Sequence, residues 1–401
     1  MNLLVLNGGS SSIKFSLFAT TGDSHDPNLL LDGELSGMGT PEATLAIAQG
    51  KQEQKKRAVE GAGTLAGAIG IVLDAVQNAG AGTVDAVGYR VVHPGAEIHD
   101  HVRITEEILK KLEEAASFAP LHDPEAVTII CETMTRMPDV PHFACFDTVF
   151  HQTMPEEAST YAIPAEYRKR GVKRYGFHGL SCESIVRQMR QYGPLPKRMV
   201  IAHLGSGCSV TAVLDGASVD TTMGLTPTGG VVMGTRPGDL DPGLVLYLLR
   251  QAREEGAADL VGAVETMLNR ASGMVALSGL PNDMRGVRKA AAERDTHAAL
   301  ALAIFTRSVK KTIGGFIALM GGVDAIVFAG GIGEHDAQSR MEILDGMEEM
   351  GILVNKELND AKESRLRRIN ASESKATVLV VPTKEDLMIA MHVDRMVRAG
   401  S

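Results

Sequence analysis

The chain has 401 residues, of which 44% are hydrophobic and 22% are charged, so its composition is that of a globular protein and excludes wholesale disorder. At ~150 residues per domain, this length predicts two or three domains. Lys+Arg 40 against Asp+Glu 49 give a net charge of −9. That charge disfavours a non-specific nucleic-acid-binding protein, which needs a basic face, but it allows small anionic substrates because local arginines can override a negative shell.

The cysteines and the N-terminus indicate where the protein works. Cys131, Cys145, Cys182 and Cys208 form no CxxC pair and no metal-like spacing with histidine, so reduced core thiols are expected. The N-terminal segment has no basic region before its short apolar run, so no signal peptide is expected. No apolar stretch approaches the ~20 residues of a membrane span. We therefore expect a soluble cytoplasmic protein that binds neither nucleic acid nor membrane.

Strand-like and helix-like patterns alternate along most of the chain, which predicts an α/β protein. In the first half, a strand at 3–6, a Gly/Ser turn and an alternating strand at 13–18 predict a hairpin. The stretch 84–93 is typical of a buried strand, and a helix at 123–137 opens with a cap followed by proline. The other elements expected here are helices at 62–79 and 105–116 and a short strand at 143–146.

The second half repeats this opening. A strand at 200–204, a Gly/Ser turn and a strand at 209–214 precede a hairpin turn at Asp215-Gly216 and a further strand at 217–221. An internal duplication is the simplest account, with each half contributing one small-residue turn to a shared cleft, although two such hairpins can also arise by chance. The domain boundary is expected near Met154-Pro155. The remaining elements are helices at 241–254, 257–271, 295–320 and from 384, and strands at 325–328 and 377–381.

The most informative segment is the first Gly/Ser turn, Asn7 to Ser12, with Lys14 just beyond it. Glycines let backbone N–H groups approach an anion, and three hydroxyls and an ammonium add donors for phosphate oxygens. The amide oxygen of Asn7 could ligate a hard cation. Neither a P-loop nor a GxGxxG fingerprint is present, so a plain hairpin turn with solvated serines remains the alternative to a phosphate site.

Two further glycine turns follow apolar strands. The segment His203 to Gly207 is the counterpart of the first turn, but a histidine that ends a buried strand is more often a hydrogen-bonded core residue than a ligand. The segment Gly330 to Glu334 follows a strand and precedes a helix, where a base or ribose could lie against the backbone. A tight strand-to-helix turn explains these glycines equally well.

Two arginines, one acid and one histidine are further candidates. Arg90 lies inside an apolar stretch, where an unpaired guanidinium would be costly, and Arg236 lies in a loop rich in glycine and proline. The planar fork of arginine matches carboxylate and phosphate, while an internal ion pair is the alternative for each. Asp147 after an apolar strand and His178 in a tight turn suit the wall of a cleft, although neither alone indicates a site.

Together these segments resemble the acetate kinase family, nearly end to end and in the family's order. The family opens with N-x-GSSS-x-K, here NGGSSSIK at 7–14, and has an R-V-V-H strand, here at 90–93. The other matching segments are AP-L-H-x-P (119–124), FDT-x-FH (146–151), RYGFHG (174–179), MGTR-x-GD-x-DP (233–242), GGIGE (330–334) and the TKEDLMIA run (383–390).

The resemblance implies two duplicated actin/Hsp70/sugar-kinase-like (ribonuclease H-like) domains around a nucleotide cleft, namely residues 1–152 plus 385–401 and residues 153–384. It implies a homodimer that transfers a phosphoryl group directly and reversibly from ATP to acetate, with Mg²⁺ or, in its place, Mn²⁺. Propionate or butyrate are alternative substrates, because one methylene in an apolar pocket is worth only ~1–3 kcal/mol. A non-catalytic nucleotide-binding regulator is the alternative from another class, and an oxidoreductase is disfavoured because no GxGxxG turn is present.

The resemblance also implies which residues bind the metal and ATP. Asn7 and Glu385 would hold the metal. The residues that would contact ATP are Ser10, Ser12, Lys14, His203, Leu204, Gly205, Ser206, Gly207, Asp283, Met284, Arg285, Gly330, Gly331, Ile332, Gly333 and Glu334.

The remaining implied roles concern the transfer itself. Arg90 would bind the substrate carboxylate, and His178 and Arg236 would stabilise the transition state. Asp147 is the family's active-site acid. Because a carboxylate substrate is already ionised and needs no general base, we expect Asp147 to hold one of the two arginines or to bridge water to Mg²⁺. The apolar wall beside the substrate would be Val92, Leu121 and Pro227.

The sequence departs from the family's usual pattern at a few positions. Ser206 replaces the asparagine of HLGNG, and its hydroxyl has a shorter reach toward phosphate, so we expect altered nucleotide affinity or donor preference. The other departures are His335 after GGIGE, Pro94 in HPG for HGG, and Thr228-Gly229 in TPTGG for TPLEG. None falls on the four candidate catalytic residues, so we expect altered specificity rather than lost activity.

Overall fold

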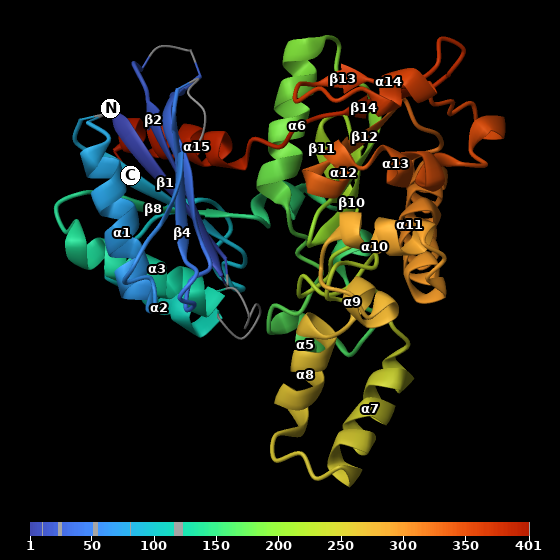
Figure 1. The fold of residues 1–401 in the computed structure, drawn as a ribbon, viewed down its shortest axis with the longest axis horizontal. Helices are drawn as coiled ribbons and strands as arrows, with labels where there is room; N and C mark the ends of the chain where they lie inside the picture. Colours follow the sequence, from blue (N-terminus) through green and yellow to red (C-terminus); the bar gives the residue numbers. More distant parts are fainter. Residues whose placement is uncertain (10, 23–25, 51–54, 81, 116–122, 401) are drawn as a thin grey trace.

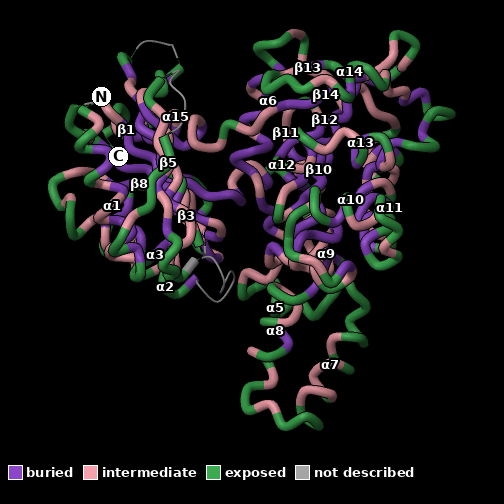
Figure 2. The backbone as a smooth tube through the Cα atoms, viewed as in Figure 1, coloured by how far each residue is buried: buried purple, intermediate pink, exposed green. Residues whose placement is uncertain are grey.

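Two lobes, each built on one mixed β-sheet, make up the structure, a computed structural model that describes residues 1–9, 11–22, 26–50, 55–80, 82–115 and 123–400. They lie side by side, with helices covering the sheets (Figure 1). Buried residues gather along the central strands, and exposed residues gather at the outer helices and loops (Figure 2). This arrangement places the strand ends and their turns where the two lobes face each other.

The first lobe contains an eight-stranded sheet in the order β5-β4-β3-β2-β1-β6-β8-β7. Its strands are β1 Asn2–Gly9, β2 Ser12–Ala19, β3 Asn28–Ser36, β4 Thr44–Gln49, β5 Lys55–Ala58, β6 Ala86–Val91, β7 Val102–Arg103 and β8 His142–Phe146. Its helices are α1 Leu65–Asn78, α2 Glu106–Ala115 and α3 Asp123–Arg136, and the C-terminal helix α15 Glu385–Ala399 returns to it.

Side-chain alternation along β1 explains how the first sheet is covered. Successive strand residues point to opposite faces. Leu4 and Leu6 therefore pack with α1 and α3 in one core cluster, whereas Leu3 and Val5 pack with α15 in another. The C-terminal helix thus brings its first residue, Glu385, beside the end of β1.

The second lobe contains a six-stranded sheet in the order β11-β10-β9-β12-β14-β13. Its strands are β9 Arg198–Leu204, β10 Cys208–Leu214, β11 Ala217–Thr221, β12 Ala325–Ala329, β13 Arg367–Arg368 and β14 Thr377–Val380. Its helices are α6 Gly179–Tyr192, α7 Pro242–Glu254, α8 Leu260–Arg270, α9 Gly273–Ser278, α10 Met284–Ala292, α11 Thr296–Leu319, α12 Gly330–His335, α13 Ala337–Leu344 and α14 Lys356–Asp360. Short helices α4 Glu156–Ser159 and α5 Ala165–Lys169 and 3₁₀ turns at Val149–Thr153 and Glu348–Met350 complete the chain.

The two sheets share one topology. In the first, β3, β2 and β1 are antiparallel neighbours, and β1, β6 and β8 are parallel neighbours. In the second, β11, β10 and β9 repeat the antiparallel part, and β9, β12 and β14 repeat the parallel part. The second sheet is also covered on both faces, by α11 and by α6. Matching order and direction over five strands supports the duplication expected from the two Gly/Ser hairpins.

The strands and helices predicted from periodicity are confirmed, with small shifts at their ends. Several elements were not predicted: strands β3, β4 and β5 and helices α6, α10 and α13. The glycine segment 330–335 is itself the short helix α12, whereas the sequence analysis expected a turn that precedes a helix. The proposed boundaries at 152/153 and 384/385 stay a prediction.

A hydrogen-bond chain ties α6 of the second lobe to α15. The Arg395 guanidinium can only donate, so Nδ1 of His392 accepts its bond at 2.9 Å. Nε2 of His392 therefore carries the ring proton and donates it to Glu183 on α6 at 2.8 Å. His101 has the same tautomer, because its Nδ1 accepts the backbone N–H of Phe146. Both Nε2 atoms therefore carry protons. The cluster of His101, His392 and Glu183 thus serves as a junction between the lobes rather than as a set of metal ligands.

Across the described part of the chain, no helix combines the length and the apolar character needed to cross a membrane.

Candidate active site

An ion pair between neighbouring parallel strands forms one wall of the site. Arg90 lies on β6, and Asp147 directly follows β8, the next strand of the sheet. Nε of Arg90 donates to Oδ1 of Asp147 at 3.0 Å, and Nη2 donates to Oδ2 at 2.6 Å. Asp147 is 1% exposed and Arg90 is 21% exposed, so the carboxylate is buried while part of the guanidinium faces the space between the lobes.

The electrostatics of Arg90 keep it charged. Burial alone would lower the pKa of Arg90, but the carboxylates of Asp147 and Glu385 outweigh burial and hold that pKa above its ordinary value. Nη1 of Arg90 lies 3.6 Å from Glu385 and 3.4 Å from Oδ1 of Asn7. The guanidinium is therefore oriented by groups from β1, β8 and α15 at once.

A cluster of oxygen ligands lies beside this arginine. Burial raises the pKa of Glu385, and Asp147 adds to that rise, although Arg90 opposes it. Burial likewise raises the pKa of Asp386, whose carboxylate accepts a bond from Ser16 at 2.8 Å. Amide and carboxylate oxygens are the ligands that Mg²⁺ prefers, and a cation would offset the cost of the buried negative charge. Asn7 and Glu385, with Asp386 next to them, therefore fit a hard divalent cation.

A pair of stacked imidazoles forms the opposite wall. His178 precedes α6 in a left-handed conformation with φ 59°, which is uncommon for a residue with a side chain. The backbone carbonyl of Asp147 accepts the N–H of Gly179 at 2.7 Å, which fixes this bend. The ring of His178 stacks on that of His203 at 4.1 Å, and a serine hydroxyl lies within 3.0 Å of Nδ1 of each ring.

Both imidazoles are uncharged at neutral pH. Burial lowers the pKa of His178 well below its usual value, and His203, Arg90 and Arg236 lower it further. Burial, with Arg90, lowers the pKa of His203 to about 4. Because the charge of Arg90 reaches both rings, the structure brings the two walls together. At neutral pH these rings therefore act as hydrogen-bonding groups rather than as cations.

The turn between β9 and β10 joins these walls to a pocket. A Cβ placed on Gly207 would lie 3.4 Å from Nε2 of His178 and 3.7 Å from Nη1 of Arg236, so the turn lies at van der Waals distance from both side chains. Arg236 is held from the other side, because its Nη1 donates to the carbonyl of Pro227 at 2.9 Å. Gly205 and Ser206 of the same turn line the pocket.

This pocket has a volume of about 680 Å³ and lies between α10 and α12. Its size is in the range of small-molecule sites. The residues that line it are Gly205, Ser206, Asn282, Asp283, Met284, Arg285, Arg288, Gly331, Ile332, His335 and Asp336. It therefore continues from the phosphate-type turn into a cavity wide enough for a nucleoside.

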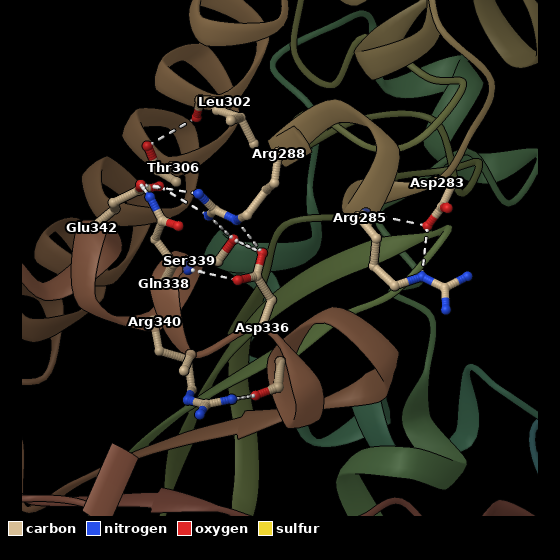
Figure 3. Close-up of polar contacts among 12 residues, drawn as sticks. Asp283, Arg285, Arg288, Leu302, Thr306, Asp336, Gln338, Ser339, Arg340 and Glu342 are labelled. Atoms are coloured by element: carbon tan, nitrogen blue, oxygen red, sulfur yellow. Dashed lines mark hydrogen bonds and ion pairs between the residues drawn. The ribbon is translucent and has the colours of Figure 1, made fainter. Parts of the chain in front are cut away.

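A network of ion pairs holds the two sides of the pocket together (Figure 3). Arg288 on α10 donates to Asp336 at 2.7 Å, to Ser339 at 2.7 Å and to Glu342 at 3.0 Å. Asp283 caps α10 and accepts from Arg285, whose side chain is otherwise in solvent. The pocket walls are thus fixed relative to each other before any ligand binds.

The structure places several other sequence-predicted site residues in different surroundings. Ser10 and Leu121 fall outside the described residues. Val92 packs against the core of the second lobe. Glu334 accepts from the N–H groups of Gly330 and Thr383, so it fixes the loop that leads to α15. Lys14 lies exposed on β2, near enough to Glu385 and Asp386 to lower the pKa of each.

The sequence analysis missed several residues that the site contains. Asn282, Arg288 and Asp336 line the pocket between α10 and α12, and Asp386 and Ser16 adjoin the oxygen cluster. Asn282 and Asp386 each adjoin a residue that the analysis did select, and that adjacency was the available signal. Arg288 carried no signal, because its partners lie about 50 residues farther along the chain.

Comparison with known proteins places this chain in a family. The acetokinase family profile matches residues 2–391. The acetate kinase of Geobacillus kaustophilus is 39% identical over 403 residues, covering 98% of each chain. The crystal structure of Porphyromonas gingivalis acetate kinase has a TM-score of 0.84 and 33% identity over 99% of each chain. That of a propionate kinase from Francisella tularensis has a TM-score of 0.86 and 35% identity over 97% of this chain and 98% of that one. The chain belongs to the acetokinase family.

Proposed function

We propose that this protein is an acetate kinase, which transfers the γ-phosphoryl group of ATP reversibly to acetate and gives acetyl phosphate and ADP. One observation carries the proposal: the turn 203–207 joins the pocket of about 680 Å³ to a centre that contains Arg90, His178 and Arg236. A nucleoside in the pocket directs its phosphates along that turn toward these groups. A two-carbon acid beside Arg90 then faces the terminal phosphate.

The reaction requires positioning and charge compensation rather than covalent catalysis. A carboxylate oxygen of acetate attacks the γ-phosphorus while the bond to the bridging oxygen breaks and ADP leaves with the electron pair. Arg90 binds the carboxylate, and Arg236 and His178 donate hydrogen bonds to the moving phosphoryl oxygens. No proton is removed, because acetate is ionised at neutral pH.

Asp147 acts by holding Arg90. Both of its oxygens already accept hydrogen bonds from that guanidinium, so they are poorly placed to act as a base. The pairing leaves Nη1 of Arg90 as the nitrogen that faces Asn7 and Glu385. The arginine is therefore presented to the substrate in one orientation.

Mg²⁺, with Mn²⁺ as a substitute, would be held by Asn7 and Glu385, whose oxygens suit a hard cation. When bound, it neutralises negative charge on the phosphates. Lys14 lies close to the same carboxylates and adds a further cation on that side. The residues of this chain thus leave a net negative site that a divalent ion would balance.

Propionate is the second candidate substrate, favoured by the similarity to a propionate kinase structure. One methylene changes binding by only ~1–3 kcal/mol, so the two acids are compared directly. Purified protein is incubated with ATP, Mg²⁺ and acetate, propionate or butyrate, and acyl phosphate is trapped with hydroxylamine. We expect the highest kcat/KM for acetate. If none of the three acids gives a hydroxamate, the kinase proposal is refuted. A clear preference for propionate or butyrate would make that acid the substrate in place of acetate.

We also propose a homodimer formed through the α7–α8 hairpin, which projects from the second lobe (Figure 1). No residue of α7 is buried, yet the helix and the loop before it expose Leu240, Leu244, Leu246 and Tyr247. A second copy would cover this apolar surface.

We further place the protein in the cytoplasm, which supplies ATP and Mg²⁺. We keep the division into residues 1–152 plus 385–401 and residues 153–384 as the two bodies that close over the substrates.

A further inference from the structure

Asn282 contacts the second Gly/Ser turn from another part of the chain. Its side-chain Nδ2 donates to Oγ of Ser206 at 2.8 Å, across 76 positions of sequence. Both residues line the pocket of about 680 Å³, and both side chains are exposed there. A ligand that enters the pocket therefore meets the two groups together.

The side chain of Asn282 packs closely against a glycine. A Cβ on Gly234 would lie 2.3 Å from Oδ1 and 2.6 Å from Nδ2 of Asn282, so the amide lies directly over a glycine. The N–H of Gly234 donates to the carbonyl of Ser206 at 3.0 Å. Asn282, Gly234 and Ser206 are thus packed as one unit rather than meeting by chance at the surface.

The direction of the hydrogen bond fixes what each group can offer. A hydroxyl has one proton and two lone pairs. Oγ of Ser206 accepts from the amide, so its own proton points away from Asn282. The amide has a second N–H that is not used in this bond. The pair therefore offers two donors from two loops at one place in the pocket.

We propose that Asn282 is a phosphate-binding residue, acting with Ser206 on the phosphate chain of the nucleotide. The side chain of Ser206 offers the phosphates a hydroxyl from the turn but no amide. Asn282 supplies an amide from the loop before α10. The turn then continues to Gly207, which lies against His178 and Arg236, so the pair precedes the transfer centre along the phosphate path. This inference rests on the proposed kinase function and adds a donor group to it.

The test compares Asn282→Ala, Ser206→Ala and the double variant by calorimetric titration with ATP, ADP and adenosine. One hydrogen bond changes affinity by about 3- to 10-fold. We expect each single variant to weaken ATP and ADP by that factor and to leave adenosine unchanged. Because the two residues act as one unit, the double variant should lose less than the product of the single losses.

A swap variant, Ser206→Asn with Asn282→Ser, moves the amide to the turn and keeps the same two groups. We expect it to bind ATP and ADP more tightly than either single variant, because both groups are present again. In the acetate assay the KM for ATP should rise in the single variants, while kcat and the KM for acetate stay constant. A purely structural role would lower the thermal midpoint and would weaken adenosine equally.

Two results would overturn this inference: unchanged ATP and ADP affinity in Asn282→Ala, or equal losses for ATP and adenosine. The titrations do not depend on turnover. If the wild type formed no acyl phosphate, the proposed function would fail, whereas the selective loss of phosphate-bearing ligands would still establish Asn282 as a phosphate-binding residue.

Discussion

Arg90 and Asp147 form a two-bond ion pair, with Nη2 of Arg90 2.6 Å from Oδ2 of Asp147, although 57 positions separate them in sequence. Arg90 lies on β6 and Asp147 directly follows the adjacent parallel strand β8, in which residue 145 is the register partner of residue 90. A sheet register therefore sets the orientation of the guanidinium that the substrate carboxylate would meet.

Replacing Asp147 by Asn should impair both turnover and stability. The substitution leaves a largely buried guanidinium without its counter-charge, which costs about 3 kcal/mol of unfolding free energy. It also frees Arg90 to reorient, so we expect kcat/KM for acetate to fall about 100-fold. The hydroxamate assay and urea unfolding measure the two effects.

Asp324→Asn is the matched control. Asp324 makes the same two-bond contact with Arg198, with the closer pair of atoms at 2.6 Å, but that pair is about one-third exposed and lies in the second lobe. We expect a loss of under about 1 kcal/mol and unchanged activity. Intact turnover in Asp147→Asn would contradict any role for Asp147 in the reaction.

His203 should remain uncharged well below neutral pH. Burial lowers its pKa to about 4, against about 6.5 in the unfolded chain. Its contribution to stability is therefore complete above pH about 6.5 and is lost as the pH falls toward 4, by about 1.4 kcal/mol per pH unit. Ring nitrogen shifts in NMR should stay constant for this residue from pH 8 to 5.5. The urea-unfolded chain is the control, because its histidine rings titrate near pH 6.5. Titration of His203 near pH 6.5 in the native protein would contradict the expectation.

Replacing Glu385 by Gln should weaken Mg²⁺ binding at the site without unfolding the protein. Removal of a ligand carboxylate should raise the Mg²⁺ concentration for half-maximal rate at least about tenfold. Burial raises the pKa of Glu385 because it makes the charged form costly in the folded state. A neutral amide avoids that cost, so the thermal midpoint should not fall. Asp394→Asn is the control, since that residue lies on the same helix and pairs with Arg398. An unchanged Mg²⁺ dependence would exclude Glu385 as a ligand.

Replacing Leu246 by Glu should separate the proposed dimer. Leu246 on α7 is 53% exposed, and a charge there would be buried without a partner in an apolar interface. Light scattering after size exclusion should give the mass of one chain for this variant and of two for the wild type. Leu300→Glu, with the same exposure on α11, should remain dimeric. A monomeric wild type, or two dimeric variants, would refute this interface.

The sequence predicted those elements whose periodicity is clean. The β1–β2 hairpin and its counterpart at β9–β10 were found because an apolar run ends at a Gly/Ser turn and an alternating strand follows that turn. The strands β3 to β5 were missed, since β5 is exposed throughout and β3 is only partly buried. β5 is the edge strand of the sheet, and because it is exposed on both faces it has no apolar side to detect.

The candidate site divides in the same way. Residue types and motif order alone selected four residues: Arg90 inside an apolar strand, Asp147 just after one, and His178 and Arg236 in glycine-rich segments. Which arginine Asp147 would hold was left open between Arg90 and Arg236. The structure pairs it with Arg90, because β6 and β8 are adjacent.

The sequence by itself determined the family, the duplicated α/β architecture and the chemical groups available for phosphoryl transfer, because these follow from local patterns and from motifs in a fixed order. Only the tertiary structure decided which groups meet: Asp147 with Arg90, the ring of His178 with that of His203, and Asn282 with Ser206. The reason is physical. A hydrogen bond between residues tens of positions apart depends on sheet register and helix packing, which the whole chain sets together and no short segment encodes.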